Sequence, residues 1–107
     1  LEPLATPVES EEFRFSILTD DFKEYGEKVL ASLENFSSSC NQWKLAEDNR
    51  EGLRVCVPNG WFLLRLSVHD PVMPMNIESN VVGGVEKTVA QLRGFFRQFD
   101  KLDTNSF

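Results

Sequence analysis

Polar side chains that can bind an anion are concentrated in residues 65–71, which read RLSVHDP. Arginine, serine, histidine and free backbone N–H groups are the donors that bind phosphate oxygens. Side chains alternate along a strand, so Arg65 and Ser67 would project from the same side. The same residue types also make an ordinary polar turn, in which Asp70 caps backbone amides and Arg65 forms a surface ion pair. Residue types alone favour the ordinary turn, because loops of this composition are common.

The rest of the sequence offers no self-contained catalytic apparatus. It has one histidine, His69, and no GxSxG nucleophile motif. It also lacks a GxxxxGK phosphate loop, and the pair Gly83-Gly84 falls short of the dinucleotide-binding pattern. The two cysteines, Cys40 and Cys56, belong to no CxxC motif or His/Cys cluster, so no zinc site is predicted. If the chain takes part in catalysis, we expect it to be a piece of a larger enzyme.

Length and charge narrow the class of protein. A chain of 107 residues has room for one domain. Its formal net charge of −6 argues against a nucleic-acid partner and disfavours an anionic membrane surface. No apolar run approaches the ~20 residues that span a bilayer, and residues 1–10 lack the pattern of a signal peptide. We expect an intracellular protein, in the cytoplasm or in an organelle such as a plastid, with any targeting segment outside this chain.

Two helices are predicted from stripes of apolar residues at helical spacing. The first ends near Ser37. The second runs from Val85 to Phe99, and Ser79-Asn80 can cap its start. Each helix is apolar on one side only, so both are expected to cover one face of a sheet.

Alternating apolar and polar residues predict the sheet. Several of its strands are joined by links of hairpin length, which require antiparallel neighbours. Pro74 has no backbone N–H and suggests an edge position or a bulge. We expect a two-layer α+β fold, with one antiparallel sheet of about four strands and two helices packed on one face. The predicted strands cover residues 12–18, 43–46, 53–57, 61–68 and 72–77. Residues 12–100 are expected to form the domain, residues 1–11 a linker or arm, and residues 101–107 a flexible tail.

Residues 65–71 belong to a longer sequence pattern that extends from Glu51 to Glu78. The residues that carry it are Glu51-Gly52-Leu53-Arg54-Val55, Gly60-Trp61-Phe62-Leu63-Leu64-Arg65, Ser67, Asp70-Pro71 and Glu78. This pattern resembles the C-terminal domain of the alpha-D-phosphohexomutase family, which includes phosphoglucomutase, phosphomannomutase and phosphoglucosamine mutase. In that family the pattern runs D-G-(L/I/V)-(R/K), a short turn, G-W-x-L-(I/V/L)-R-x-S-(G/N)-T-E-P, and a strand ending in E-A. The resemblance extends over residues 12–99.

The resemblance implies a division of labour between domains. Phosphohexomutases interconvert sugar 1-phosphates and 6-phosphates through a phosphorylated serine in the first domain, a magnesium loop in the second and sugar-reading residues in the third. The C-terminal domain closes over the cleft and holds the phosphate that is not being transferred. By position, Arg65, Ser67, Val68 and His69 would bind that phosphate, and no residue of this chain would be catalytic.

The same resemblance names the partners and cofactors. The implied partners are a hexose phosphate substrate and the other domains of the parent chain. Magnesium is implied for the full-length parent, and no cofactor is implied for this domain.

The sequence also departs from the family pattern. Val68 stands where the family has Gly or Asn, His69 where it has Thr, and Asp70 where it has Glu. A β-branched residue such as Val68 resists a positive φ. Many members also carry arginine in the next strand, where this chain has Pro74 and Asn76.

Three interpretations follow from these departures. The first is a working mutase of unusual specificity, with His69 replacing threonine at the phosphate. The second is a catalytically degenerate family member that serves as a binding or structural protein. The third is a small α+β interaction or ligand-sensing module unrelated to mutases, and the G-W-x-L-L-R-x-S spacing argues against it.

Overall fold

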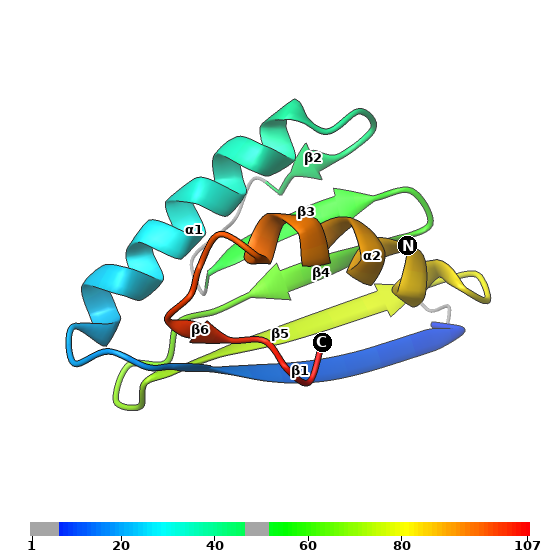
Figure 1. The fold of residues 1–107 in the computed structure, drawn as a ribbon. Coiled ribbons are helices and arrows are strands. Elements are labelled where there is room, and N and C mark those ends of the chain that lie inside the picture. Colours follow the sequence, from blue (N-terminus) through cyan, green and yellow to red (C-terminus); the bar gives the residue numbers. More distant parts are fainter. Residues whose placement is uncertain (1–6, 47–51) are drawn as a thin grey trace.

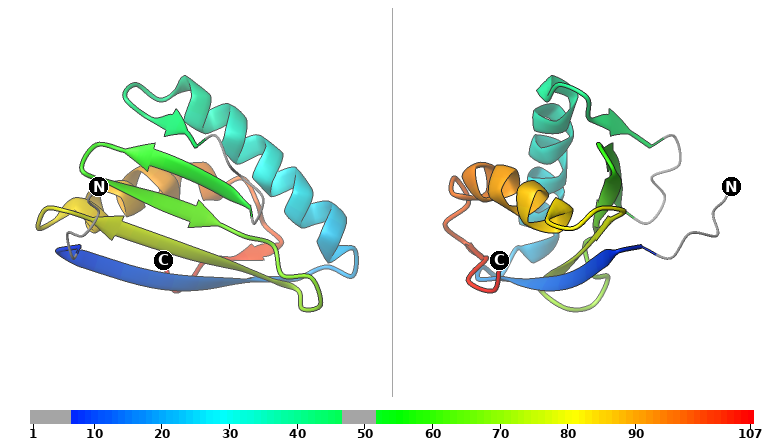
Figure 2. Two further views of the ribbon diagram at one scale, coloured as in Figure 1. Left: turned by 180° about the vertical axis from the view of Figure 1, so that it is seen from behind. Right: turned by 90° about the vertical axis from the view of Figure 1, so that its right-hand side faces the viewer.

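The computed structural model describes residues 7–46 and 52–107. Its elements, shown in Figure 1, are β1 (Glu9–Ile17), α1 (Phe22–Ser39), β2 (Lys44–Leu45), β3 (Leu53–Val57), β4 (Gly60–Leu64), β5 (Val72–Ser79), α2 (Gly84–Phe96) and β6 (Leu102–Asp103). The strands form one antiparallel sheet in the order β2-β3-β4-β5-β1-β6. Both helices lie on one face of this sheet and neither covers the other face, which is called the open face below (Figure 2).

The predicted fold class, α+β with both helices on one face of an antiparallel sheet, is confirmed. The described residues form six strands rather than about four. Residues 43–46, where a short strand was expected, contain β2, whereas β6 was not expected. Both strands are two residues long and lie at the two edges of the sheet. The two residues of β6 are too few for an alternating pattern to reveal a strand.

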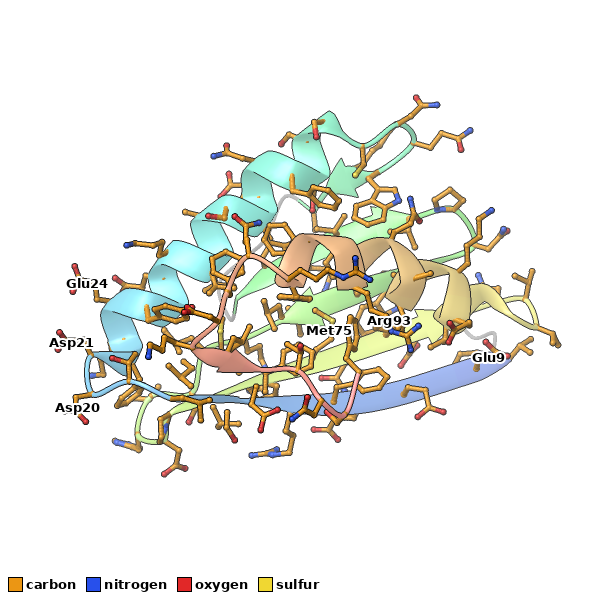
Figure 3. The ribbon with its side chains drawn as sticks, viewed as in Figure 1. Glu9, Asp20, Asp21, Glu24, Met75 and Arg93 are labelled. Atoms are coloured by element: carbon orange, nitrogen blue, oxygen red, sulfur yellow. The ribbon has the colours of Figure 1, made fainter. Side chains whose placement is uncertain are left out.

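The core fills the space between the sheet and the helices. Phe15 of β1, Phe62 of β4 and Met75 of β5 are fully buried there. Met75 lies in the middle of the sheet, between the two ends of the domain (Figure 3). Burying a side chain of this kind contributes about 1.5–3 kcal/mol, so this layer supplies much of the stability of the fold.

Pro74 occupies an internal strand, so the expectation of an edge position or a bulge is wrong. It belongs to β5, which lies between β4 and β1. The Arg65 N–H donates to the Pro74 carbonyl oxygen at 2.9 Å. Bonded residues in an antiparallel pair normally exchange two such bonds, but proline has no N–H to return. Pro74 is tolerated here because its missing donor falls just beyond Leu64, the last residue of β4.

The start of α2 is held by a residue far away in sequence. The expected cap, Ser79-Asn80, is wrong, because the Ser79 hydroxyl accepts from the Val81 N–H at 3.0 Å and does not reach α2. Instead, the Glu9 carboxylate of β1 accepts from the N–H groups of Gly83 at 2.9 Å and Val85 at 3.1 Å. These two hydrogen bonds lower the pKa of Glu9. Glu9 thereby ties the first strand to the last helix.

In place of the expected flexible tail, residues 101–107 fold back onto the domain. Their strand β6 pairs with the end of β1. The Phe107 ring packs edge-on against Phe13 and Phe15, with ring centroids 4.9 and 5.2 Å apart. Arg93 of α2 donates from Nε and Nη2 to the Phe107 carbonyl oxygen at 3.3 and 3.1 Å. A single aromatic residue among polar ones has no periodicity from which this packing could be predicted.

Candidate phosphate-binding site

Residues 65–71, called the 65–71 loop below, connect β4 to β5 at the end of the sheet where β1 leads into α1 (Figure 1). The Ser67 N–H donates to the Val72 carbonyl oxygen at 3.0 Å, and the Val72 N–H donates to the Asp70 carbonyl oxygen at 2.7 Å. The Ile17 N–H of β1 donates to the Pro71 carbonyl oxygen at 2.7 Å. The loop is therefore a tight connection bonded to both neighbouring strands.

Leu66 fixes the loop to the helical layer. Its side chain is half-buried and packs against the core. A Cβ added at Gly26 of α1 would collide with Leu66 Cδ1 and would lie 2.9 Å from Leu66 Cδ2. Only a glycine at this position lets the helix come so close to the loop. Because side chains alternate, Arg65 and Ser67 project from the opposite side, over the open face.

The Arg65 side chain is half-buried. Within residues 7–46 and 52–107, it forms no ion pair and no side-chain hydrogen bond. The surface ion pair of the ordinary-turn interpretation is therefore not found in that part of the chain. A buried or half-buried guanidinium keeps five donors in a planar fork, and an oxyanion can accept two of them at once.

Ser67 shapes the turn that follows. Its hydroxyl oxygen accepts from the Asp70 N–H at 3.3 Å. The ordinary-turn interpretation has the Asp70 side chain capping amides, whereas here the serine caps the aspartate's own amide. As an acceptor in this bond, the Ser67 hydroxyl still has its proton to donate to a ligand.

The tip of the loop is exposed at Val68, His69 and Asp70. The backbone N–H groups of Val68 and His69 donate to no acceptor among the described residues. In that part of the chain, the residues other than glycine with positive φ are Gln42 and Asn59. Val68 therefore keeps a backbone conformation that a β-branched residue tolerates. The change from Gly or Asn to Val68 costs the loop a small or amide side chain without straining its backbone.

Acidic groups limit where an anion can lie. Asp20, Asp21 and Glu24 gather at the first turn of α1 (Figure 3). A hollow of about 380 Å³ adjoins the loop at Pro71 and is also lined by Asp20. These carboxylates repel a phosphate on the α1 side. Arg65 and Ser67 project on the other side of the loop, away from these three carboxylates.

A second hollow lies away from the predicted site. It has a volume of about 220 Å³ and is lined by Trp43, Asn59, Val82 and Lys87, among others. None of the predicted phosphate-binding residues lines it. It is built from segments that are distant in sequence, so no local pattern could have indicated it. Its place beside the start of α2 puts it at the opposite end of the sheet from the loop (Figure 1).

The described residues hold no group of three or more His, Cys, Asp or Glu side chains that could bind a metal ion. The helices described here are also too short or too polar to cross a membrane. No family model matches the sequence, and no curated protein matches it significantly.

Proposed function

We propose that this chain is the C-terminal, substrate-phosphate-binding domain of a phosphoglucomutase- or phosphomannomutase-like protein that performs intramolecular phosphoryl transfer on hexose phosphates. The observation that carries the proposal is the coincidence of two sets of donors at one turn. Arg65 has no ion-pair partner among the described residues, and the N–H groups of Val68 and His69 donate to none of them. The sequence resemblance to phosphohexomutases supplies the identity of the ligand.

In this proposal each residue has a distinct role. Arg65 neutralises the phosphate and binds two of its oxygens. The N–H groups of Val68 and His69 and the hydroxyl of Ser67 bind the remaining oxygens, and the His69 ring stands where the family has a threonine hydroxyl. Leu66 positions the loop without touching the ligand, since it packs toward α1.

The contribution to catalysis is positional. A phosphate held far from the reacting oxygen fixes the orientation of the sugar, and closure of the domain excludes water. Phosphoryl transfer itself, and the magnesium ion that the family requires, belong to other domains of the proposed parent chain.

The proposal is tested by an amide NMR titration of this chain with glucose 6-phosphate and with inorganic phosphate. We expect shifts centred on residues 67–70. Arg65→Ala is expected to weaken binding at least about tenfold, because a charge-assisted hydrogen bond contributes about 1.5–3 kcal/mol. Arg97→Ala, just beyond α2, removes the same charge elsewhere and should leave the affinity unchanged. Absence of shifts at residues 67–70 in the wild-type chain would refute the proposal.

A further inference from the structure

A second arginine lies in the same cross-strand row as Arg65. In the β1–β5 register, Arg14 lies directly opposite Pro74. On the other side of β5, Arg65 is bonded to Pro74 through its N–H. The row therefore runs Arg65, Pro74, Arg14 across three strands. Neighbouring strands are about 4.8 Å apart, so the two arginine backbones are about 10 Å apart.

Both arginines project over the open face of the sheet. Phe13 and Phe15, the sequence neighbours of Arg14, point toward the core, so alternation places Arg14 on the opposite side. Pro74, between the two arginines, is buried and has no polar side chain to compete for a ligand. Two long cationic side chains thus flank a small apolar floor.

The next row toward the loop adds hydroxyl groups. Ser16 of β1 lies opposite Val72 of β5, and the Ser67 N–H is bonded to Val72 on the other side. The two rows together place two arginines and two serines around Pro74 and Val72. Arginine guanidinium groups and serine hydroxyl groups both donate hydrogen bonds to phosphate oxygens.

The carboxylates of Glu12, on β1, and Asp103, on β6, flank these two rows. Glu12 lies 3.7 Å from Arg14, measured from Oε2 to Nη1, and both side chains are more than half exposed. Such an exposed pair contributes only about 0.2–1 kcal/mol, so an anion can compete for Arg14. Asp103 of β6 lies opposite Ser16, and its Oδ1 already accepts from the Asn105 N–H at 3.0 Å.

We propose that Arg14 is a second phosphate-binding residue, which approaches the ligand of Arg65 from the other side of Pro74. The phosphate then lies over the open face, between β4 and β1, away from Asp20 and the first turn of α1. This inference rests on the proposed function. It adds Arg14 of β1, which lies outside the sequence pattern that contains Arg65.

The test measures the affinity of 15N-labelled chain for inorganic phosphate and for glucose 6-phosphate at low ionic strength. Arg14→Ala is expected to weaken both about threefold to tenfold, since Arg14 is more exposed than Arg65. Glu12→Gln frees Arg14 and removes a negative charge, so it is expected to strengthen binding about twofold to threefold. Arg97→Ala serves as the control for overall charge.

The possible results separate this inference from the proposed function. Shifts at residues 67–70 that depend on Arg65 but are unchanged by both Arg14→Ala and Glu12→Gln would overturn the role of Arg14 and leave the proposed function standing. Loss of affinity in Arg14→Ala together with a gain in Glu12→Gln would establish it. Absence of phosphate binding by the wild-type chain would overturn both the proposed function and the role of Arg14. A gain of phosphate affinity in Glu12→Gln cannot result from misfolding of the variant.

Discussion

Gly52 lies against Arg65 so closely that no side chain fits between them. A Cβ added at Gly52 would be 3.0 Å from Arg65 Cα and 3.1 Å from Arg65 Cγ, and it would collide with the Leu64 carbonyl oxygen. The φ of Gly52 is +152°, a conformation that side chains disfavour. The glycine that precedes β3 therefore leaves the space that the stem of Arg65 occupies. This contact gives a physical reason for the joint presence of Gly52 and Arg65 in the sequence pattern.

Replacing Gly52 tests this relationship. Gly52→Ala is expected to lower the free energy of unfolding by about 1–3 kcal/mol, because the backbone must either keep a strained φ or move away from Leu64. Urea denaturation followed by far-UV circular dichroism measures the loss. A variant as stable as the wild type would show that Gly52 and Arg65 are not in close contact.

Two helical glycines form a matched pair for the contact between α1 and the 65–71 loop. Gly94 of α2 has open space where a Cβ would go, so Gly94→Ala is expected to stabilise the protein by about 0.5–1 kcal/mol through helix propensity. At Gly26 the new methyl group meets Leu66 and must displace it. We expect Gly26→Ala to be about 1–3 kcal/mol less stable than Gly94→Ala. The amides of residues 65–67 should shift in Gly26→Ala alone. Equal stabilities of the two variants, together with unshifted amides of residues 65–67 in Gly26→Ala, would contradict the contact between Gly26 and Leu66.

Stability at low pH reports on the link between Glu9 and α2. The pKa of Glu9 in the folded protein is lower than its ordinary value of 4.5, because its carboxylate accepts from the N–H groups of Gly83 and Val85. Its contribution to stability is therefore fully present above the ordinary pKa and is lost as the pH falls through the lowered, folded-state pKa. Glu9→Gln should be less stable than the wild type at pH 7, and the difference should shrink below pH 4.5. Glu11→Gln on the same strand is the control, and an equal response of the two variants would argue against the cap.

Ser67 is expected to act on both the turn and the ligand. Ser67→Ala removes the acceptor of the Asp70 N–H and should cost about 0.5–1.5 kcal/mol of stability. It should also weaken phosphate binding, because one hydroxyl donor is lost. Ser38→Ala removes an exposed helical hydroxyl, which donates to the Glu34 carbonyl oxygen, and is the matched control for affinity. Unchanged phosphate affinity in Ser67→Ala would remove Ser67 from the site.

Local sequence patterns were sufficient for the parts of the fold that alternate or repeat. The alternation over residues 12–18 indicated β1, and the helical stripe from Val85 indicated α2. In both cases a single element carries its own periodicity, so the core face can be read without knowing its neighbours. The fold class followed from the order of these elements and the short links between them.

Features that depend on which strands are neighbours, and in which register, could not be predicted from the periodicity of a single element. Glu9, which caps α2, is separated in sequence from Gly83 by 74 positions and from Val85 by 76 positions. The internal position of Pro74 depends on which strands flank β5. Residue types indicated the 65–71 loop, but not the side on which its donors lie. That side follows from Leu66 packing against Gly26, a contact between two elements that are separated in sequence.

The most direct measurement is the NMR signal of the Arg65 Nε–Hε group during a titration with inorganic phosphate. A guanidinium that binds phosphate oxygens moves its Hε resonance downfield, so this signal reports the contact itself rather than a nearby change. We expect the Arg65 Hε signal, assigned by its absence in Arg65→Ala, to move together with the amides of residues 67–70 and with the same dissociation constant. An Arg65 Hε signal that stays in place while phosphate is added to saturation would contradict phosphate recognition by this domain.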